Sequence, residues 1–250
     1  KCILQSCVSL LRDKKINLQK LRPKKNGIID LNELEECFKK IDKGTQTSMY
    51  RSFVSIMAAN NEIGVIQPIR EIAELCKKYN AIFHTDAVQA VGTTKIDVKE
   101  MDIDSLSLSS HKIYGPKGIG VIYLNKKFFY NIDPILDGGG QEMRVRSGTL
   151  PTALCVGMGE ACEHISKNRE QFINKIIKVR DLFLKELRLK VGEVIINGDL
   201  KQRICNNLNL YIPNINADEL MAHIPHIAIS TGSACTALFV GPSNVLTELD

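Results

Sequence analysis

The stretch PIREIAELCKKYNAIFH, residues 68–84, decides the fold class of this chain. Its apolar residues before Asn80 recur at the spacing of one helix face, and Pro68 is typical of a helix start. These apolar residues are Ile69, Ile72, Ala73 and Cys76. Residues 81–84 then form a short apolar run that predicts a buried strand. A helix followed directly by a buried strand is typical of an α/β fold.

The same alternation continues on both sides of this stretch. Short apolar or alternating runs predict further strands at residues 53–58, 104–109 and 120–124. Apolar residues at helical spacing predict helices over residues 3–12 and 30–41, and a long one over 172–187 that Gly192 ends. We therefore expect an α/β fold with a mainly parallel sheet.

Two domains are expected along the chain. The strands and short helices place the large domain at residues 1–167. The long helix marks the start of a smaller C-terminal α+β domain at residues 168–250.

Length and composition exclude several classes of protein. The 250 residues are 44% hydrophobic and 24% charged, which is typical of a globular protein. No apolar run is long enough to span a membrane, so we expect no membrane partner. The absence of Trp disfavours a base-stacking surface, and we interpret the basic residues 1–25 as a solvated face. We therefore expect no nucleic-acid partner, and salt-dependent DNA binding through residues 1–25 is a distant alternative.

The eight cysteines fit reduced thiols better than a disulfide framework. Their spacing is irregular and contains no CxxC pair, so we expect no metal site. Reduced thiols indicate an intracellular protein. Its compartment, mitochondrial or cytoplasmic, stays open. The chain begins with Lys1 rather than Met, so we expect it to be a piece of a longer protein.

Polar residues follow three of the predicted strands, at the point where each strand ends. They are Asn61 after the first, Asp86 and Gln89 after the second, and Ser109, His111 and Lys112 after the third. Because ligands of parallel α/β sheets bind beyond the carboxyl ends of the strands, we expect these side chains to meet at one rim.

The residue types at this rim suit pyridoxal 5'-phosphate. This cofactor needs a lysine for its Schiff base, which Lys112 supplies, and an acid against its ring nitrogen, which Asp86 supplies. It also needs a donor to its phenolic oxygen, either Gln89 or Asn61. Donors to its phosphate would come from Ser109 together with His111.

Five motifs also carry a family resemblance, and they occur in order along nearly the whole chain. They are ANNEIG (59–64), HTDAVQ (84–89), SSHKIYGPKGIG (109–120), RSGTLP (146–151) and TGSACT (231–236). Together they resemble the cysteine desulfurases, the IscS/NifS-like branch of the class-V aminotransferases. The resemblance implies the fold of the fold-type I pyridoxal-phosphate enzymes, with helices on both faces of the sheet.

The resemblance implies roles for the residues around the ring. Lys112 matches the Schiff-base lysine, and Asp86 matches the partner of the ring nitrogen. Gln89 and Asn61 match positions that contact the phenolic oxygen and the bound substrate.

It also implies a phosphate site that needs a second subunit. Ser109 and His111 match phosphate ligands, and His111 is also a candidate for moving a proton. Thr149 matches a phosphate contact that the family supplies from the partner subunit. A homodimer is therefore expected.

Cys235 matches the nucleophile that accepts sulfur. The implied reaction removes sulfur from L-cysteine, gives L-alanine and leaves a persulfide on Cys235. An iron–sulfur scaffold or another acceptor, for thiolation of tRNA or a cofactor, would then take the sulfur. The other seven cysteines are expected to pack in the interior.

Alternatives remain open at this stage. The family carries an upstream phosphate-binding turn, a ring-stacking histidine and a downstream arginine for the substrate, none of which is present in residues 1–250. A selenocysteine lyase or another class-V enzyme is one alternative, although the Cys235 motif favours the desulfurase. A catalytically inactive chain that serves as scaffold or dimer partner is the other.

Overall fold

The computed structural model describes residues 2–44, 51–127, 132–232 and 243–249. Contacts between residues divide the chain into two compact units. The first comprises residues 1–46, 60–67 and 176–250, and the second comprises residues 47–59 and 68–175. Each unit is described by itself.

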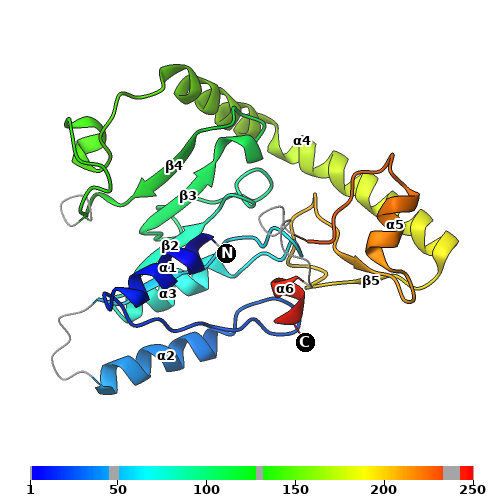
Figure 1. The fold of residues 1–250 in the computed structure, drawn as a ribbon, viewed down its shortest axis with the longest axis horizontal. Helices are drawn as coiled ribbons and strands as arrows, with labels where there is room; N and C mark the ends of the chain where they lie inside the picture. Colours follow the sequence, from blue (N-terminus) through cyan, green and yellow to red (C-terminus); the bar gives the residue numbers. More distant parts are fainter. Residues whose placement is uncertain (1, 45–50, 128–131, 233–242, 250) are drawn as a thin grey trace. The chain divides into compact units, whose positions relative to one another are not determined.

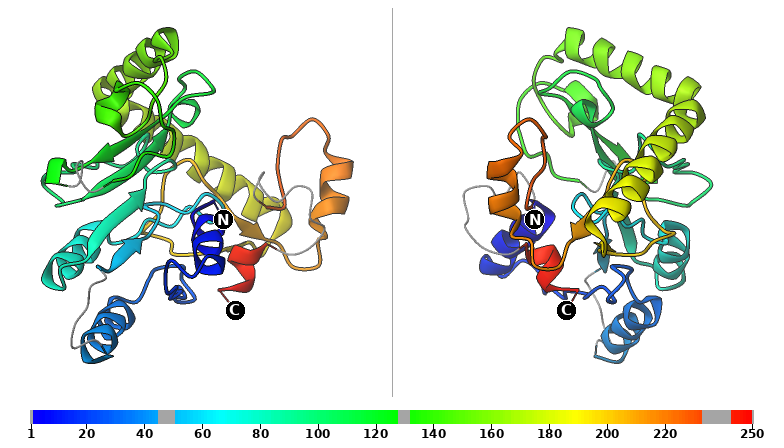
Figure 2. Two further views of the ribbon diagram at one scale, coloured as in Figure 1. Left: turned by 60° about the vertical axis from the view of Figure 1, so that its left-hand side comes forward. Right: turned by 90° about the vertical axis from the view of Figure 1, so that its right-hand side faces the viewer.

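The second unit contains a four-stranded sheet in the order β1-β2-β3-β4 (Figures 1 and 2). These strands are β1 (Phe53–Ser55), β2 (Ile82–Asp86), β3 (Ser105–Ser109) and β4 (Gly120–Leu124). β1, β2 and β3 run parallel, and β4 pairs antiparallel with β3. The prediction of a mainly parallel sheet is therefore confirmed within the described residues.

Helix α3 (Ile69–Lys78) packs against β2 and buries the predicted apolar stripe. Pro68 caps this helix rather than forming its first residue, and the helix ends before Tyr79. Phe83 of β2 and Leu106 of β3 point to one face of the sheet and are buried. Each such side chain stabilises the fold by roughly 1.5–3 kcal/mol relative to exposure.

Helix α4 (Thr152–Val191) is longer than predicted. It begins at Thr152 rather than near Phe172. The sequence did not predict this start, because the first half of the helix buries only Met158 and Ile165 and so has no strong apolar stripe. Gly192 ends it as predicted, with a φ of 81° and its N–H bonded to the Arg188 carbonyl at 3.0 Å. The expected domain boundary between residues 167 and 168 lies inside α4 and stays a prediction.

The first unit combines helices with a short antiparallel pair of strands, and the predicted C-terminal α+β domain of residues 168–250 stays a prediction. Its helices before α4 are α1 (Cys2–Arg12) and α2 (Leu31–Gly44). After α4 come β5 (Ile195–Ile196), β6 (Leu210–Tyr211), α5 (Ala217–His223) and α6 (Asn244–Thr247). Among the described residues, no helix has both the length and the apolar character that crossing a membrane requires.

Candidate active site

The carboxyl ends of β2 and β3 bring several of the predicted residues to one rim of the second unit. Asp86 is the last residue of β2 and Ser109 is the last residue of β3. The two strands are parallel, and Asp86 stands opposite Ser107 in the register. The 3-10 turn η1 (Ser110–Lys112) follows Ser109 directly. The structure therefore places Asp86, Ser109 and η1 at the ends of neighbouring strands, as predicted.

Asp86 is half-buried and keeps one carboxylate oxygen available. Its Oδ1 accepts the N–H of Val88 at 3.1 Å, and its main-chain oxygen accepts the N–H of Ala58 at 2.8 Å. Within the described part of the chain, no hydrogen bond to Oδ2 is found. Gln89 lies half-buried in the turn that follows. A carboxylate that is fixed through one oxygen can accept a hydrogen bond from a ligand at its other oxygen.

Ser109 and His111 form a hydrogen-bonded pair at the end of β3. The Ser109 Oγ lies 2.8 Å from the Nδ1 of His111. When the hydroxyl donates to Nδ1, the ring proton sits on Nε2, which can donate outward. The exposed His111 ring is then an N–H donor suited to an anion.

Turn η1 presents Lys112 between two buried anchors. Ser110 and Ile113 are buried, whereas Lys112 is exposed. Gly115 closes the turn by donating its N–H to the Ser110 carbonyl at 3.0 Å. A Cβ at Gly115 would lie 2.1 Å from the Ser110 Oγ, so a side chain does not fit there. The chain thus holds an exposed amine on a tightly packed turn.

Asn61 belongs to the first unit, where it lies in a turn held from several sides. The Oδ1 of Asn60 accepts the N–H of Glu62 at 2.8 Å. The side chains of Asn207 and Asn209 both donate to the Glu62 carbonyl, at 3.1 and 3.2 Å. Asn61 itself is exposed on this turn. Its predicted role in the site stays a prediction.

The last two predicted site residues are Thr149 and Cys235. Thr149 is exposed and follows Ser147, which is buried and donates its Oγ to the Gly139 carbonyl at 2.7 Å. The short 3-10 segment η3 (Gln141–Arg144) lies between these partners in sequence. Cys235 lies outside the described residues. The predicted roles of both residues stay predictions.

The expectation that the other cysteines pack in the interior is only partly correct. Cys76 and Cys205 are buried, and burial with nearby Asp104 raises the pKa of the Cys76 thiol to about 12. Cys2 and Cys162 are exposed on their helices, so the expectation is wrong for these two. Among the described residues, no group of three or more metal-binding side chains is found.

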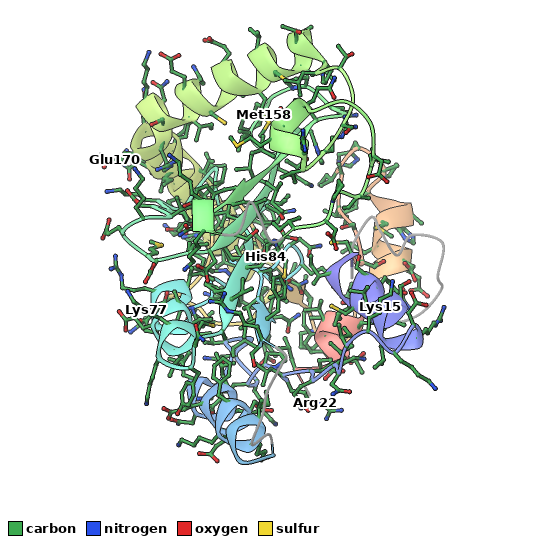
Figure 3. All side chains as sticks on the ribbon, turned by 90° about the vertical axis from the view of Figure 1, so that its left-hand side faces the viewer. Lys15, Arg22, Lys77, His84, Met158 and Glu170 are labelled. Atoms are coloured by element: carbon green, nitrogen blue, oxygen red, sulfur yellow. The ribbon has the colours of Figure 1, made fainter. Side chains whose placement is uncertain are left out.

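One polar residue at the sheet was missed by the sequence reasoning. The ring of His84 lies between two hydroxyls, with Nδ1 2.8 Å from the Ser55 Oγ and Nε2 2.8 Å from the Ser107 Oγ. Figure 3 shows His84 within the sheet, and 5% of the residue is exposed. Burial lowers its pKa, and the nearby Asp86 carboxylate opposes that shift. The sequence shows a histidine in one predicted strand and serines in both neighbouring strands. It does not show the register that places the two serines beside the histidine ring.

Known proteins match the chain over its whole length. The chain is 43% identical to the cysteine desulfurase IscS of Ehrlichia chaffeensis over 251 residues, which covers 100% of this chain and 59% of that protein. It is also 43% identical to the IscS of Rickettsia prowazekii, covering 58% of that protein. The chain thus spans less than two thirds of the length of these curated relatives.

Solved structures agree with the sequence relatives. The crystal structure of a NifS-like protein from Rickettsia africae superposes with a TM-score of 0.82 at 32% identity, covering 97% of this chain and 62% of that one. Residues 1–248 match the family described as aminotransferase class-V. Because this match spans nearly the entire sequence, the chain belongs to the class-V aminotransferase family.

Proposed function

We propose that the protein containing this chain is a pyridoxal-phosphate-dependent cysteine desulfurase. The observation that supports this most strongly is the rim of the second unit. There a held carboxylate, a serine–histidine pair and an exposed lysine stand at the ends of β2 and β3. The similarity to the IscS proteins supports the choice of reaction.

The donor set at the rim fits pyridoxal 5'-phosphate. The open oxygen of Asp86 suits the ring nitrogen, and the pair of Ser109 and His111 suits a phosphate. The exposed amine of Lys112 suits the aldehyde. When bound, the cofactor supplies an electron sink that stabilises negative charge at the substrate α-carbon.

Each residue has a task in binding and orientation. Asp86 keeps the proton on the ring nitrogen, because a carboxylate stabilises the charged form of its partner. Lys112 would hold the cofactor through its aldehyde, and once the substrate amine has replaced it there, the freed Nζ would accept the α-proton of the substrate. Gln89 would donate to the phenolic oxygen, and Ser109 with His111 would bind the phosphate. The contact expected of Asn61, with the phenolic oxygen or the substrate, stays a prediction.

The complete reaction needs residues beyond the described rim. L-Cysteine gives its sulfur to the thiolate of Cys235, so that the C–S bond breaks, an S–S bond forms and L-alanine leaves. Thr149 reaches the phosphate of the partner subunit, which requires a homodimer. An iron–sulfur scaffold or another acceptor then takes the sulfur from Cys235. A location inside the cell, mitochondrial or cytoplasmic, stays a prediction.

The test uses the full-length protein loaded with pyridoxal phosphate. On addition of L-cysteine, alanine should form and peptide mass spectrometry should find one added sulfur on Cys235. The Cys235→Ser variant should give neither, and the Cys162→Ser variant is the matched control that should behave as the wild type. Equal persulfide on other cysteines, with none on Cys235, would contradict the proposal.

A further inference from the structure

Three parallel strands are joined side chain to side chain by a hydroxyl–imidazole bridge, formed by Ser55, His84 and Ser107. Ser55 comes from β1, His84 from β2 and Ser107 from β3. Both contacts to the His84 ring measure 2.8 Å. The ring of Phe53 also stacks on the imidazole, with 6.1 Å between centroids and 17° between planes. The imidazole therefore has a partner at each nitrogen and an aromatic neighbour beside its ring.

The bridge holds a neutral histidine. A neutral imidazole has one donor and one acceptor nitrogen, and a serine hydroxyl can serve either. His84 is almost fully buried, and burial lowers its pKa, because the charged form would lose its hydration. The charged group that acts on it among the described residues is Asp86, whose effect is the smaller. The neutral ring therefore makes its hydrogen bonds to both serines, and it places no positive charge beside the Asp86 carboxylate.

The bridge lies directly next to the residue that the proposed function assigns to the ring nitrogen. His84 and Asp86 are two residues apart on β2, so their side chains point to the same face of the sheet. Beyond the bridge, main-chain hydrogen bonds join the same segments of the chain. The N–H of Ala58 bonds to the Asp86 carbonyl at 2.8 Å, and the N–H of Ala87 bonds to the Ser107 carbonyl at 2.9 Å. A shift of β2 against either neighbour would thus move the Asp86 carboxylate.

We propose that His84 is a positioning residue, which bridges β1 and β3 as a neutral group and so holds the Asp86 carboxylate against the cofactor ring nitrogen. This inference rests on the proposed function. It adds a residue that does not itself touch the cofactor. The chemistry requires a neutral side chain with a donor and an acceptor, so a glutamine should replace the histidine better than an apolar residue of similar size.

The experiment measures the ring nitrogen rather than turnover. The full-length protein and its variants are loaded with pyridoxal phosphate that carries ¹⁵N at the ring position. The nitrogen chemical shift reports whether the ring nitrogen is protonated, and dialysis reports cofactor retention. The variants are His84→Leu, His84→Gln, Ser107→Ala and Ser55→Ala. His164→Leu on α4 is the matched control, because His164 is exposed and distant in sequence from the bridge.

We expect His84→Leu to move the nitrogen signal toward the unprotonated position and to weaken cofactor retention about tenfold. The substitution removes both hydrogen bonds of the bridge and leaves the two serine hydroxyls without their imidazole partner. His84→Gln should keep most of both properties, and His164→Leu should match the wild type. Ser107→Ala and Ser55→Ala should shift the signal in the same direction by less. These serine variants also decide the matter if His84→Leu does not fold.

Two failures are distinguishable. A wild type that takes up no pyridoxal phosphate would contradict the proposed function, and the positioning role with it. A wild type with a protonated ring nitrogen, together with unchanged signals in His84→Leu and in both serine variants, would contradict the positioning role alone. A shift of the nitrogen signal in His84→Gln equal to that in His84→Leu would also contradict it, because neutral hydrogen bonding would then not be what positions Asp86.

Discussion

The two faces of the central strands differ in the interactions that their side chains make. On one face, Phe83 and Leu106 are buried apolar side chains that stabilise the sheet by leaving water. On the other face, Ser55, His84 and Ser107 are polar groups that satisfy one another by hydrogen bonds. The first arrangement is non-directional and tolerates change in detail, whereas the second fixes positions. The comparison indicates that the apolar face stabilises the sheet, whereas the polar face fixes the positions of the residues proposed for the cofactor site.

The largest expected effect is a loss of stability when a side chain of the apolar face is removed. Phe83→Ala removes a side chain with no exposed surface, and we expect it to lower the free energy of unfolding by roughly 3–5 kcal/mol. Denaturant titration of the full-length protein measures this. Ile122→Ala on β4 is the control, because Ile122 is 55% exposed and should cost far less. Equal losses in the two variants would contradict the assigned difference between the faces.

The next effect concerns the polar rim. Asp86→Ala removes the carboxylate assigned to the ring nitrogen, and we expect cofactor retention to fall at least about tenfold because a charge-assisted hydrogen bond is lost. Equilibrium dialysis with pyridoxal phosphate measures it. Asp97→Ala is a matched control, since Asp97 also caps its own turn by accepting the N–H groups of Lys99 and Glu100. If both variants retained the cofactor equally, the assignment of Asp86 would be wrong.

A smaller effect on cofactor binding is expected to differ between the two ends of β3. Ser109→Ala at the carboxyl end of β3 should weaken cofactor binding by about three- to tenfold, because one phosphate donor is lost. Ser105→Ala, on the same strand and face but at the amino end, should leave binding unchanged. Titration of the cofactor by its absorbance measures both. A loss with Ser105→Ala but not with Ser109→Ala would place the ligand at the wrong end of the sheet.

The smallest effect is the pH dependence that His84 contributes to stability. Its folded pKa lies below the usual 6.5, so below pH 6.5 the unfolded chain binds more protons than the folded one. Its contribution is therefore complete above about pH 6.5 and is lost as the pH falls from there toward the folded pKa. His84→Gln should flatten this part of the stability profile, measured by denaturant titration from pH 7.5 to 5. An unchanged slope would mean that His84 is not held neutral.

Much of this could be predicted from the sequence, because period and position carry the signal. The four strands of the sheet and the stripe of α3 follow from apolar spacing. The residues after β2 and β3 follow from the rule that parallel strands end at one edge. Asp86, Ser109 and Lys112 were therefore predictable as neighbours.

The remainder depends on registers and packing that a sequence does not show. The bridge at His84 needs β1, β2 and β3 to align so that Ser55 and Ser107 flank one ring. The early start of α4 was missed, because an exposed helix does not need an apolar stripe.

The most direct test of the central claim is where pyridoxal phosphate attaches. The full-length protein is mixed with the cofactor and reduced with borohydride, and the labelled peptide is mapped by mass spectrometry. Lys117 is the internal control, because it is also exposed and lies on the same loop. We predict label on Lys112, none on Lys117, and loss of label in Lys112→Ala but not in Lys117→Ala. Equal label on both lysines, or label elsewhere with none on Lys112, would contradict the assignment of the rim as the cofactor site.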